Sequence, residues 1–114
     1  MKSSLKDKKC MPCEGIGQAL DKYLQKELLQ QLNNWEIIDE HHLFKSYKFE
    51  DFASALKWVN EVGELAEKEG HHPDIYLSWG KVDIKIWTHA LNGLTENDFV
   101  LAAKIDSLYE ICHS

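Results

Sequence analysis

The sequence predicts an α+β domain, in which a four-stranded antiparallel sheet carries its helices on one face. Two observations support this fold class. Apolar residues recur at helical spacing in three stretches, and between these stretches they alternate in strand-like runs that come in pairs. The resulting element order is α-β-β-α-β-β-α, and paired strands joined by short turns favour antiparallel hairpins.

The first predicted helix spans about residues 16–32. Its apolar stripe consists of Ile16, Leu20, Leu24, Leu28 and Leu32, with Tyr23 beside them. Strand-like runs follow at residues 35–38 and 43–49, and residues 39–42 between them are expected to form a hairpin turn. In the second run, Leu43, Tyr47 and Phe49 are predicted to share one face.

The second predicted helix begins after Asp51, whose side chain suits an N-cap position. Gly70 suits the position after its C-terminus, where φ is positive. The predicted buried stripe consists of Phe52, Ala55, Leu56, Val59, Val62 and Ala66. Trp58 lies beside this stripe and is expected in the core or in an interface.

A second hairpin and a third helix complete the predicted domain. Apolar residues alternate from 75 to 79, and Gly80-Lys81 favours a turn. Residues 82–88 give the strongest strand pattern in the chain, and we interpret this strand as an edge of the sheet. Thr95 and Asp98 form a capping box for the last helix. Its apolar residues are Leu101, Ala102, Ile105, Leu108, Tyr109 and Cys112.

The 114 residues fit one domain, which we place at residues 14–114 after a flexible tail at 1–13. The net charge of −6 argues against binding to nucleic acid or to an anionic membrane. Apolar runs are too short to span a bilayer, and no signal-peptide pattern is expected at the start. Three cysteines make a disulfide framework improbable, so we expect a cytoplasmic protein.

The run His71-His72-Pro73 stands where a helix ends and a strand begins. Histidine titrates near neutral pH and can therefore both donate and accept a proton. Pro73 favours an extended conformation at His72, and Glu67 lies one helical turn before His71, where it can orient an imidazole. The alternative interpretation is a solvated loop with two surface histidines.

His89 ends the best strand, on the face that also carries Trp87 and Lys85. It is either a functional group at a strand end or a histidine without a role at the sheet edge. Trp87 is the tryptophan best placed to line a site for a flat ring. The neighbouring pair His41-His42 is interpreted as solvated surface.

Metal binding is a competing interpretation of two motifs. Cys10 and Cys13 have the spacing of half a zinc site or of a redox pair, but no second pair with suitable spacing follows. His71, His72 and His89 together offer the three-histidine set of some catalytic zinc sites. A histidine-ligated hydrolase therefore remains an alternative at this point.

Taken together, these motifs resemble the pterin-4a-carbinolamine dehydratases, in particular the bacterial type. The family pattern runs here through Glu67, His71-His72-Pro73, Trp79, His89 and Asp98, and the agreement extends to residues 79–82, Thr88 and Gly93-Leu94. The resemblance covers about residue 14 to the end. The Cys10–Cys13 segment also resembles bacterial members.

The resemblance implies an enzyme that removes water from a 4a-hydroxytetrahydropterin and yields a quinonoid dihydropterin, with no metal and no organic cofactor. It implies that His71 and His89 act as acid and base and that His72 positions the pterin, so these three form the catalytic set. The substrate-binding residues that it implies are Glu67, Gly70, Pro73, Trp87, Thr88, Ala90 and Asp98. For Asp98, helix capping explains the pattern equally well.

The same resemblance implies a homodimer or homotetramer and a functional link to an aromatic amino acid hydroxylase, whose turnover produces the substrate. Two further alternatives stay open. Animal relatives also serve as dimerisation cofactors of a transcription factor, so the domain can be a non-catalytic binding module. The dehydratase can also act on a different pterin, such as an intermediate of molybdenum cofactor metabolism.

Overall fold

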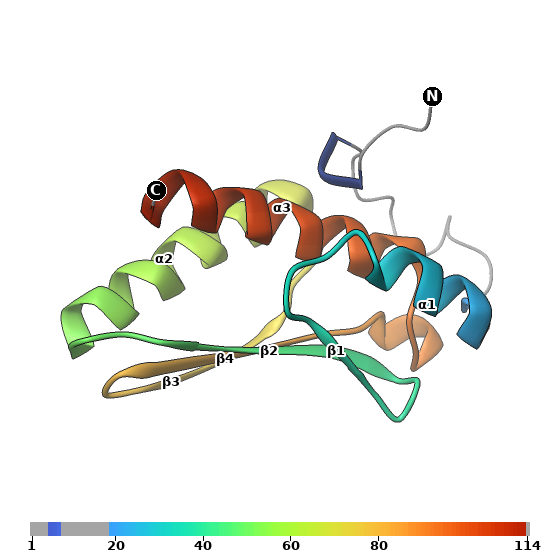
Figure 1. Cartoon of the computed structure of the whole chain (residues 1–114), viewed down its shortest axis with the longest axis horizontal. Coiled ribbons are helices and arrows are strands. Elements are labelled where there is room, and N and C mark those ends of the chain that lie inside the picture. Colours follow the sequence, from blue (N-terminus) through green and yellow to red (C-terminus); the bar gives the residue numbers. More distant parts are fainter. Residues whose placement is uncertain (1–4, 8–18, 114) are drawn as a thin grey trace.

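Four strands form one antiparallel sheet, and the helices lie on one of its faces (Figure 1). The computed structural model describes residues 5–7 and 19–113. The elements are η1 (Leu5–Asp7), α1 (Lys22–Leu29), β1 (Glu36–Ile38), β2 (His42–Lys48), α2 (Phe52–Glu69), β3 (Asp74–Ser78), β4 (Lys81–Ile86), η3 (His89–Leu91) and α3 (Glu96–His113). The predicted fold class and the order α-β-β-α-β-β-α are confirmed.

The strand order in the sheet is β1-β2-β4-β3, and every neighbouring pair is antiparallel. β4 therefore lies inside the sheet, and the prediction that residues 82–88 form an edge is wrong. Alternation along one strand shows which side chains face the core, but it does not show how many neighbours the strand has. The two edges are β1 and β3.

The first hairpin turns more tightly than predicted. Asp39 and Glu40 have φ values of 52° and 55°, and the His41 N–H donates to the Ile38 carbonyl at 2.9 Å. Positive φ at both central residues of the turn from Ile38 to His41 is typical of type I′, and the strands pair again one residue later, at Ile38 and His42. His42 consequently belongs to β2 rather than to the turn.

α1 is shorter than the predicted helix, and the predicted stripe is confirmed only in part, because Leu20, Leu28 and Leu32 contact the core and Leu24 does not. It begins after Asp21, whose carboxylate accepts the Leu24 N–H at 2.9 Å. Leu24 is 45% exposed, so its predicted place on the apolar stripe is wrong, and Tyr23, predicted beside the stripe, is 75% exposed. Gln25 is buried instead, because its side-chain amide donates to the carbonyls of Leu20 and Glu40. The predicted start at Ile16 lies outside the described residues.

α2 has both predicted ends. The Asp51 carboxylate accepts the Ser54 N–H at 2.8 Å, and Gly70 adopts φ of 66° after the last turn. The buried stripe consists of Ala55, Trp58, Val62 and Ala66. Phe52 and Leu56 are 45% and 40% exposed, so their predicted burial is wrong. They lie at the rim of the stripe, because positions 52 and 56 point well away from its centre at 100° per residue.

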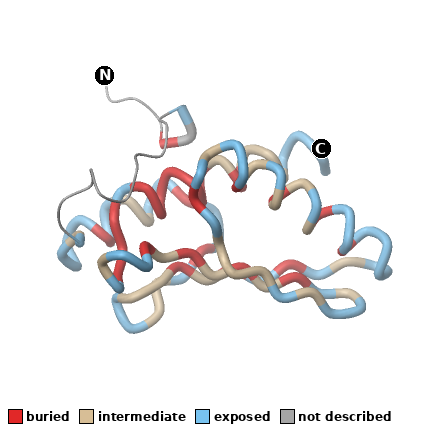
Figure 2. The backbone as a smooth tube through the Cα atoms, turned by 180° about the vertical axis from the view of Figure 1, so that it is seen from behind, coloured by how far each residue is buried: buried red, intermediate tan, exposed pale blue. Residues whose placement is uncertain are grey.

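The core lies between the helices α2 and α3 and the inner face of the sheet, where the buried residues concentrate (Figure 2). Val82, Ile84 and Ile86 of β4 are fully buried there, as their alternation predicts. Thr88 continues this face beyond the strand. Of the predicted tail, the structure describes residues 5–7, where Leu5 is buried against α3. In the described part of the chain, no helix has the length and apolarity that crossing a membrane requires.

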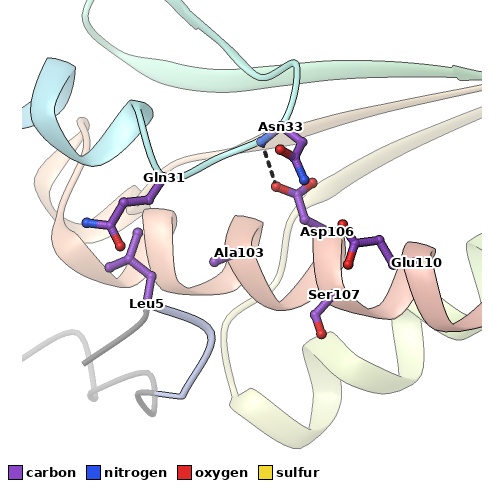
Figure 3. Close-up of a pocket in the computed structure, with 7 residues that line it drawn as sticks. All are labelled: Leu5, Gln31, Asn33, Ala103, Asp106, Ser107 and Glu110. Carbon is purple, nitrogen blue, oxygen red and sulfur yellow. Dashed lines mark hydrogen bonds between the residues drawn. The ribbon is translucent and has the colours of Figure 1, made fainter. Parts of the chain in front are cut away.

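A buried ion pair joins the sheet to α3. Lys45 shares the core face of β2 with Leu43 and Tyr47, a position that the sequence analysis passed over. Its ammonium lies 3.0 Å from the Asp106 carboxylate. That carboxylate also accepts the Trp35 indole N–H at 2.8 Å. It accepts the Asn33 backbone N–H at 2.9 Å as well, and this last bond is drawn in Figure 3. A buried charge needs such partners, since desolvation alone is costly.

We expect Asp106→Ala to lower the free energy of unfolding by about 3 kcal/mol or more, because it leaves the Lys45 ammonium buried without a counter-charge. Urea unfolding at pH 7 measures this. The matched control is Asp83→Ala, which breaks the partly exposed pair with Lys81 and is expected to cost less than about 1 kcal/mol. Equal losses in the two variants would contradict the prediction.

Candidate active site

Asp98 is the centre of the candidate site and is fully buried. It stands at the third position of α3, where its Oδ2 accepts the Thr95 backbone N–H at 2.8 Å and the Thr88 hydroxyl at 2.9 Å. The first of these bonds is the predicted capping interaction. The second bond ties the start of α3 to the segment that follows β4.

His71 binds the other oxygen of Asp98. Its Nε2 lies 2.6 Å from Asp98 Oδ1, and only 6% of the residue is exposed. Since a carboxylate accepts hydrogen bonds, Nε2 carries the proton, and Nδ1 of the neutral ring holds the lone pair. Capping and a hydrogen bond to a site histidine therefore coexist at Asp98, which the sequence pattern alone did not resolve.

The end of α2 brings His71 into this position. Gly70 reverses the chain in the left-handed region, and the His71 N–H then donates to the Ala66 carbonyl at 3.2 Å. This is the backbone bond expected of a helix that ends on a left-handed glycine. The imidazole is thereby turned back towards α3 and not out into the loop.

His72 and Glu67 form a separate, exposed pair. His72 Nε2 lies 2.6 Å from Glu67 Oε2, and their side chains are 62% and 76% exposed. The histidine that Glu67 contacts is therefore His72, although Glu67 lies one turn before His71. Pro73 follows, half-buried, just before β3 begins at Asp74.

The residues after β4 form a closed loop. β4 ends at Ile86, two residues before the predicted end, and Thr88 pairs with Gly93 through backbone bonds of 2.9 and 3.4 Å. His89 and Ala90 are exposed within η3, inside this loop. The rings of Trp87 and His89 meet edge to face, with their centroids 4.3 Å apart.

His41 and His42 belong to the same neighbourhood, so their interpretation as solvated surface is wrong. Both are half-buried, and their ring centroids lie 5.3 and 6.1 Å from that of Trp87. The register of β2 and β4 pairs Leu43 with Ile86, which brings these histidines beside Trp87. Strand register was the missing signal, and it depends on the tertiary pairing.

Burial lowers the pKa of His42, and the Lys85 ammonium and the neighbouring His41 ring lower it further. Asp39 and Asp74 act in the opposite direction but do not outweigh these effects. His42 is consequently held in its neutral form more firmly than an ordinary histidine. It serves as a hydrogen-bonding and packing group at neutral pH.

The structure thus assembles two groups of the predicted residues. His71 and Thr88 meet on Asp98. His89 meets Trp87 on the neighbouring loop. Thr88 and His89 are adjacent in sequence, so the two groups are joined through the start of this loop. Histidines with different partners and different exposure are suited to different proton-transfer roles.

A family model described as pterin 4 alpha carbinolamine dehydratase matches residues 18–108. The chain belongs to this family. A relative from Rubrobacter xylanophilus with the name pterin-4-alpha-carbinolamine dehydratase is 50% identical over 106 residues, covering 93% of this chain and 99% of its own. A relative of the same name from Rickettsia bellii is 51% identical, covering 92% and 94% respectively.

A solved structure described as a transcriptional coactivator/pterin dehydratase from Brucella melitensis superimposes with a TM-score of 0.74. It is 32% identical and covers 80% of this chain and 98% of its own. The resemblance to pterin-4a-carbinolamine dehydratases predicted from the sequence is therefore confirmed.

The pocket in Figure 3 is not part of the dehydratase motif. It holds about 220 Å³ and is lined by Leu5, Gln31, Asn33, Ala103, Asp106, Ser107 and Glu110. Its one buried carboxylate, Asp106, already has three donors. We assign this pocket a structural role and place the candidate site at the histidines. Within residues 5–7 and 19–113, no group of three or more potential ligands is arranged to hold a metal ion, and Cys10 and Cys13 lie outside these ranges.

The lowered pKa of His42 predicts a pH dependence of stability. The unfolded chain binds a proton at this residue more strongly than the folded chain, so the free energy of unfolding falls as the pH drops below about 6.5. In His42→Gln this part of the decline is absent. Urea unfolding of both proteins in steps from pH 8 to pH 5 measures it. Parallel curves for the two proteins would contradict the prediction.

Proposed function

We propose that the chain is a 4a-hydroxytetrahydropterin dehydratase, a hydro-lyase that forms a quinonoid dihydropterin in the recycling of tetrahydropterin. Membership of the dehydratase family supports this activity. The observation that carries the mechanism is His71, held at 2.6 Å on the buried Asp98. This contact fixes the orientation and the tautomer of one imidazole, as general acid–base catalysis requires.

The reaction needs two proton transfers. The bond between C4a and the hydroxyl oxygen breaks, that oxygen gains a proton and leaves as water, and a ring nitrogen loses a proton while its lone pair forms the new double bond. Hydroxide is a poor leaving group near neutral pH. A positioned imidazole that protonates the departing oxygen therefore lowers the barrier and typically raises the rate by a factor of about 10²–10⁴.

In this proposal, His71 exchanges a proton through Nδ1 while Asp98 holds Nε2. His89, exposed on the loop after β4, is the second acid–base group. His72, paired with Glu67, positions the pterin. Trp87 offers an aromatic face beside His89, and Thr88 supports Asp98 from the same segment.

Backbone and side-chain contacts from Gly70, Pro73 and Ala90 complete the proposed substrate site. The proposal requires neither a metal ion nor an organic cofactor. It also includes a homodimer or homotetramer in the cytoplasm, supplied with substrate by an aromatic amino acid hydroxylase.

The deciding experiment is dehydration of chemically generated 4a-hydroxytetrahydropterin in metal-free buffer, followed by ultraviolet absorbance. We expect rapid dehydration by the wild type and a loss of about 10² or more in rate in His71→Ala and in His89→Ala. A wild-type rate equal to that of buffer would refute the dehydratase assignment. The binding-module and metal-dependent alternatives would then remain.

Asp98→Asn separates the two roles of this residue. The amide oxygen still accepts a hydrogen bond at the helix N-terminus, but the carboxylate that fixes the His71 tautomer is gone. We expect kcat to fall by about tenfold or more. Asp51→Asn, the same change at the N-cap of α2, is the control and should retain the wild-type rate. Full activity in Asp98→Asn would exclude the proposed role of the carboxylate.

The description of the Brucella relative as a transcriptional coactivator favours protein binding as a second candidate function. Phe52 and Leu56 on α2 are large apolar side chains exposed on the single chain and can serve such contacts. The catalytic variants distinguish the two functions, because His71→Ala removes dehydration without altering this surface.

A further inference from the structure

A chain of contacts connects the first hairpin to the loop that carries His89. His41 Nε2 lies 2.8 Å from the side-chain oxygen of Asn92, 51 residues further along the chain. His41 Nδ1 lies 3.1 Å from His42 Nδ1. Both histidine rings contact Trp87, whose ring also contacts His89. Neither His41 nor His42 belongs to the His-His-Pro motif or to the residues assigned to the reaction above.

The hydrogen bonds define which nitrogen of each ring carries a proton. The Asn92 oxygen is an acceptor, so His41 Nε2–H is the donor. The Nδ1 of neutral His41 then accepts the Nδ1–H of His42. Neutral His42, favoured by its lowered pKa, is compatible with this arrangement. The pair therefore acts as one ordered unit that ends on Asn92.

Asn92 is the residue that closes the His89 loop. It adopts φ of 50° and ψ of 46° at the end of η3, and its backbone N–H donates to the His89 carbonyl at 3.2 Å. A non-glycine residue in this left-handed region is uncommon, although asparagine tolerates it better than most. His41 is thus bonded to the residue at which the His89 loop reverses direction, three residues after His89.

We propose that His41 is a positioning residue for His89, acting through the hydrogen bond to Asn92 and through the Trp87 ring. His42 supports it by donating to His41 Nδ1. This inference rests on the proposed function, because it assigns His89 a role in dehydration. A small displacement of a group that reacts with the substrate lowers the rate steeply, and a loop of exposed residues needs such an anchor.

The test is a double-mutant cycle on His41 and Asn92. His41→Phe keeps an aromatic ring against Trp87 but removes the donor, and Asn92→Gly keeps the positive φ but removes the acceptor. We expect kcat to fall roughly tenfold in each single variant, with KM within about twofold, and to fall no further in the double variant. His41→Gln and Asn92→Asp, which keep a donor and an acceptor, should restore most of the rate.

A readout without substrate separates this inference from the proposed function. In the free protein, the Trp87 ring, whose centroid lies 4.3 Å from that of His89, is expected to shift the NMR signals of the His89 ring protons. We expect His41→Phe and Asn92→Gly to move these signals alike and the double variant to add nothing, while thermal unfolding verifies that each variant is folded. Unchanged His89 signals, or effects on kcat that multiply to about a hundredfold in the double variant, would overturn the positioning role. A wild type without dehydratase activity would refute the proposed function, and the NMR cycle would still test the contact.

Discussion

The hydrogen bonds of the buried Asp98 carboxylate are the interaction on which the candidate site depends. A carboxylate with no exposed surface is stable only when donors replace the water that it has lost. Thr95, Thr88 and His71 supply them, and they come from the start of α3, the segment after β4 and the end of α2. One side chain thereby holds together three segments that the topology brings to the same end of the sheet. His71 is therefore oriented by its bond to Asp98, because the buried carboxylate needs a hydrogen-bond donor for the chain to fold.

The core of the molecule makes this arrangement rigid. The inner face of β4 is fully buried in the core that α2 and α3 form with the sheet, so the strand end and the start of α3 have little freedom to move apart. Two turns further along α3, Asp106 forms a second buried polar contact, with Lys45 of the sheet. The two contacts fix the position of α3 over the sheet at its start and near its middle. The positions of the candidate site residues therefore depend on the packing of the helices on the sheet as well as on the contacts of the histidines.

The histidines lie in three distinct environments, and each environment suits a different task. His71 is buried and bound to a carboxylate, His72 is exposed and paired with Glu67, and His89 lies on a loop against Trp87. The first environment fixes a tautomer, the second allows adjustment to a ligand, and the third gives access to solvent. The first hairpin adds His41 and His42 to this end of the sheet. The site is thus built from four segments, of which the family motif includes all but the first hairpin.

The sequence by itself determined the fold class, the ends of α2, the inner face of β4 and the capping role of Asp98, because these depend on residues within a few positions of one another. It also pointed to the family, through the spacing of the His-His-Pro motif, His89 and Asp98. Only the tertiary structure decided that His71 is the partner of Asp98 and His72 that of Glu67. It also decided that Lys45 is buried, that β4 is an interior strand and that His41 reaches Asn92. Each of these depends on which strands are neighbours and on how a helix crosses the sheet. Local sequence patterns do not determine such long-range contacts.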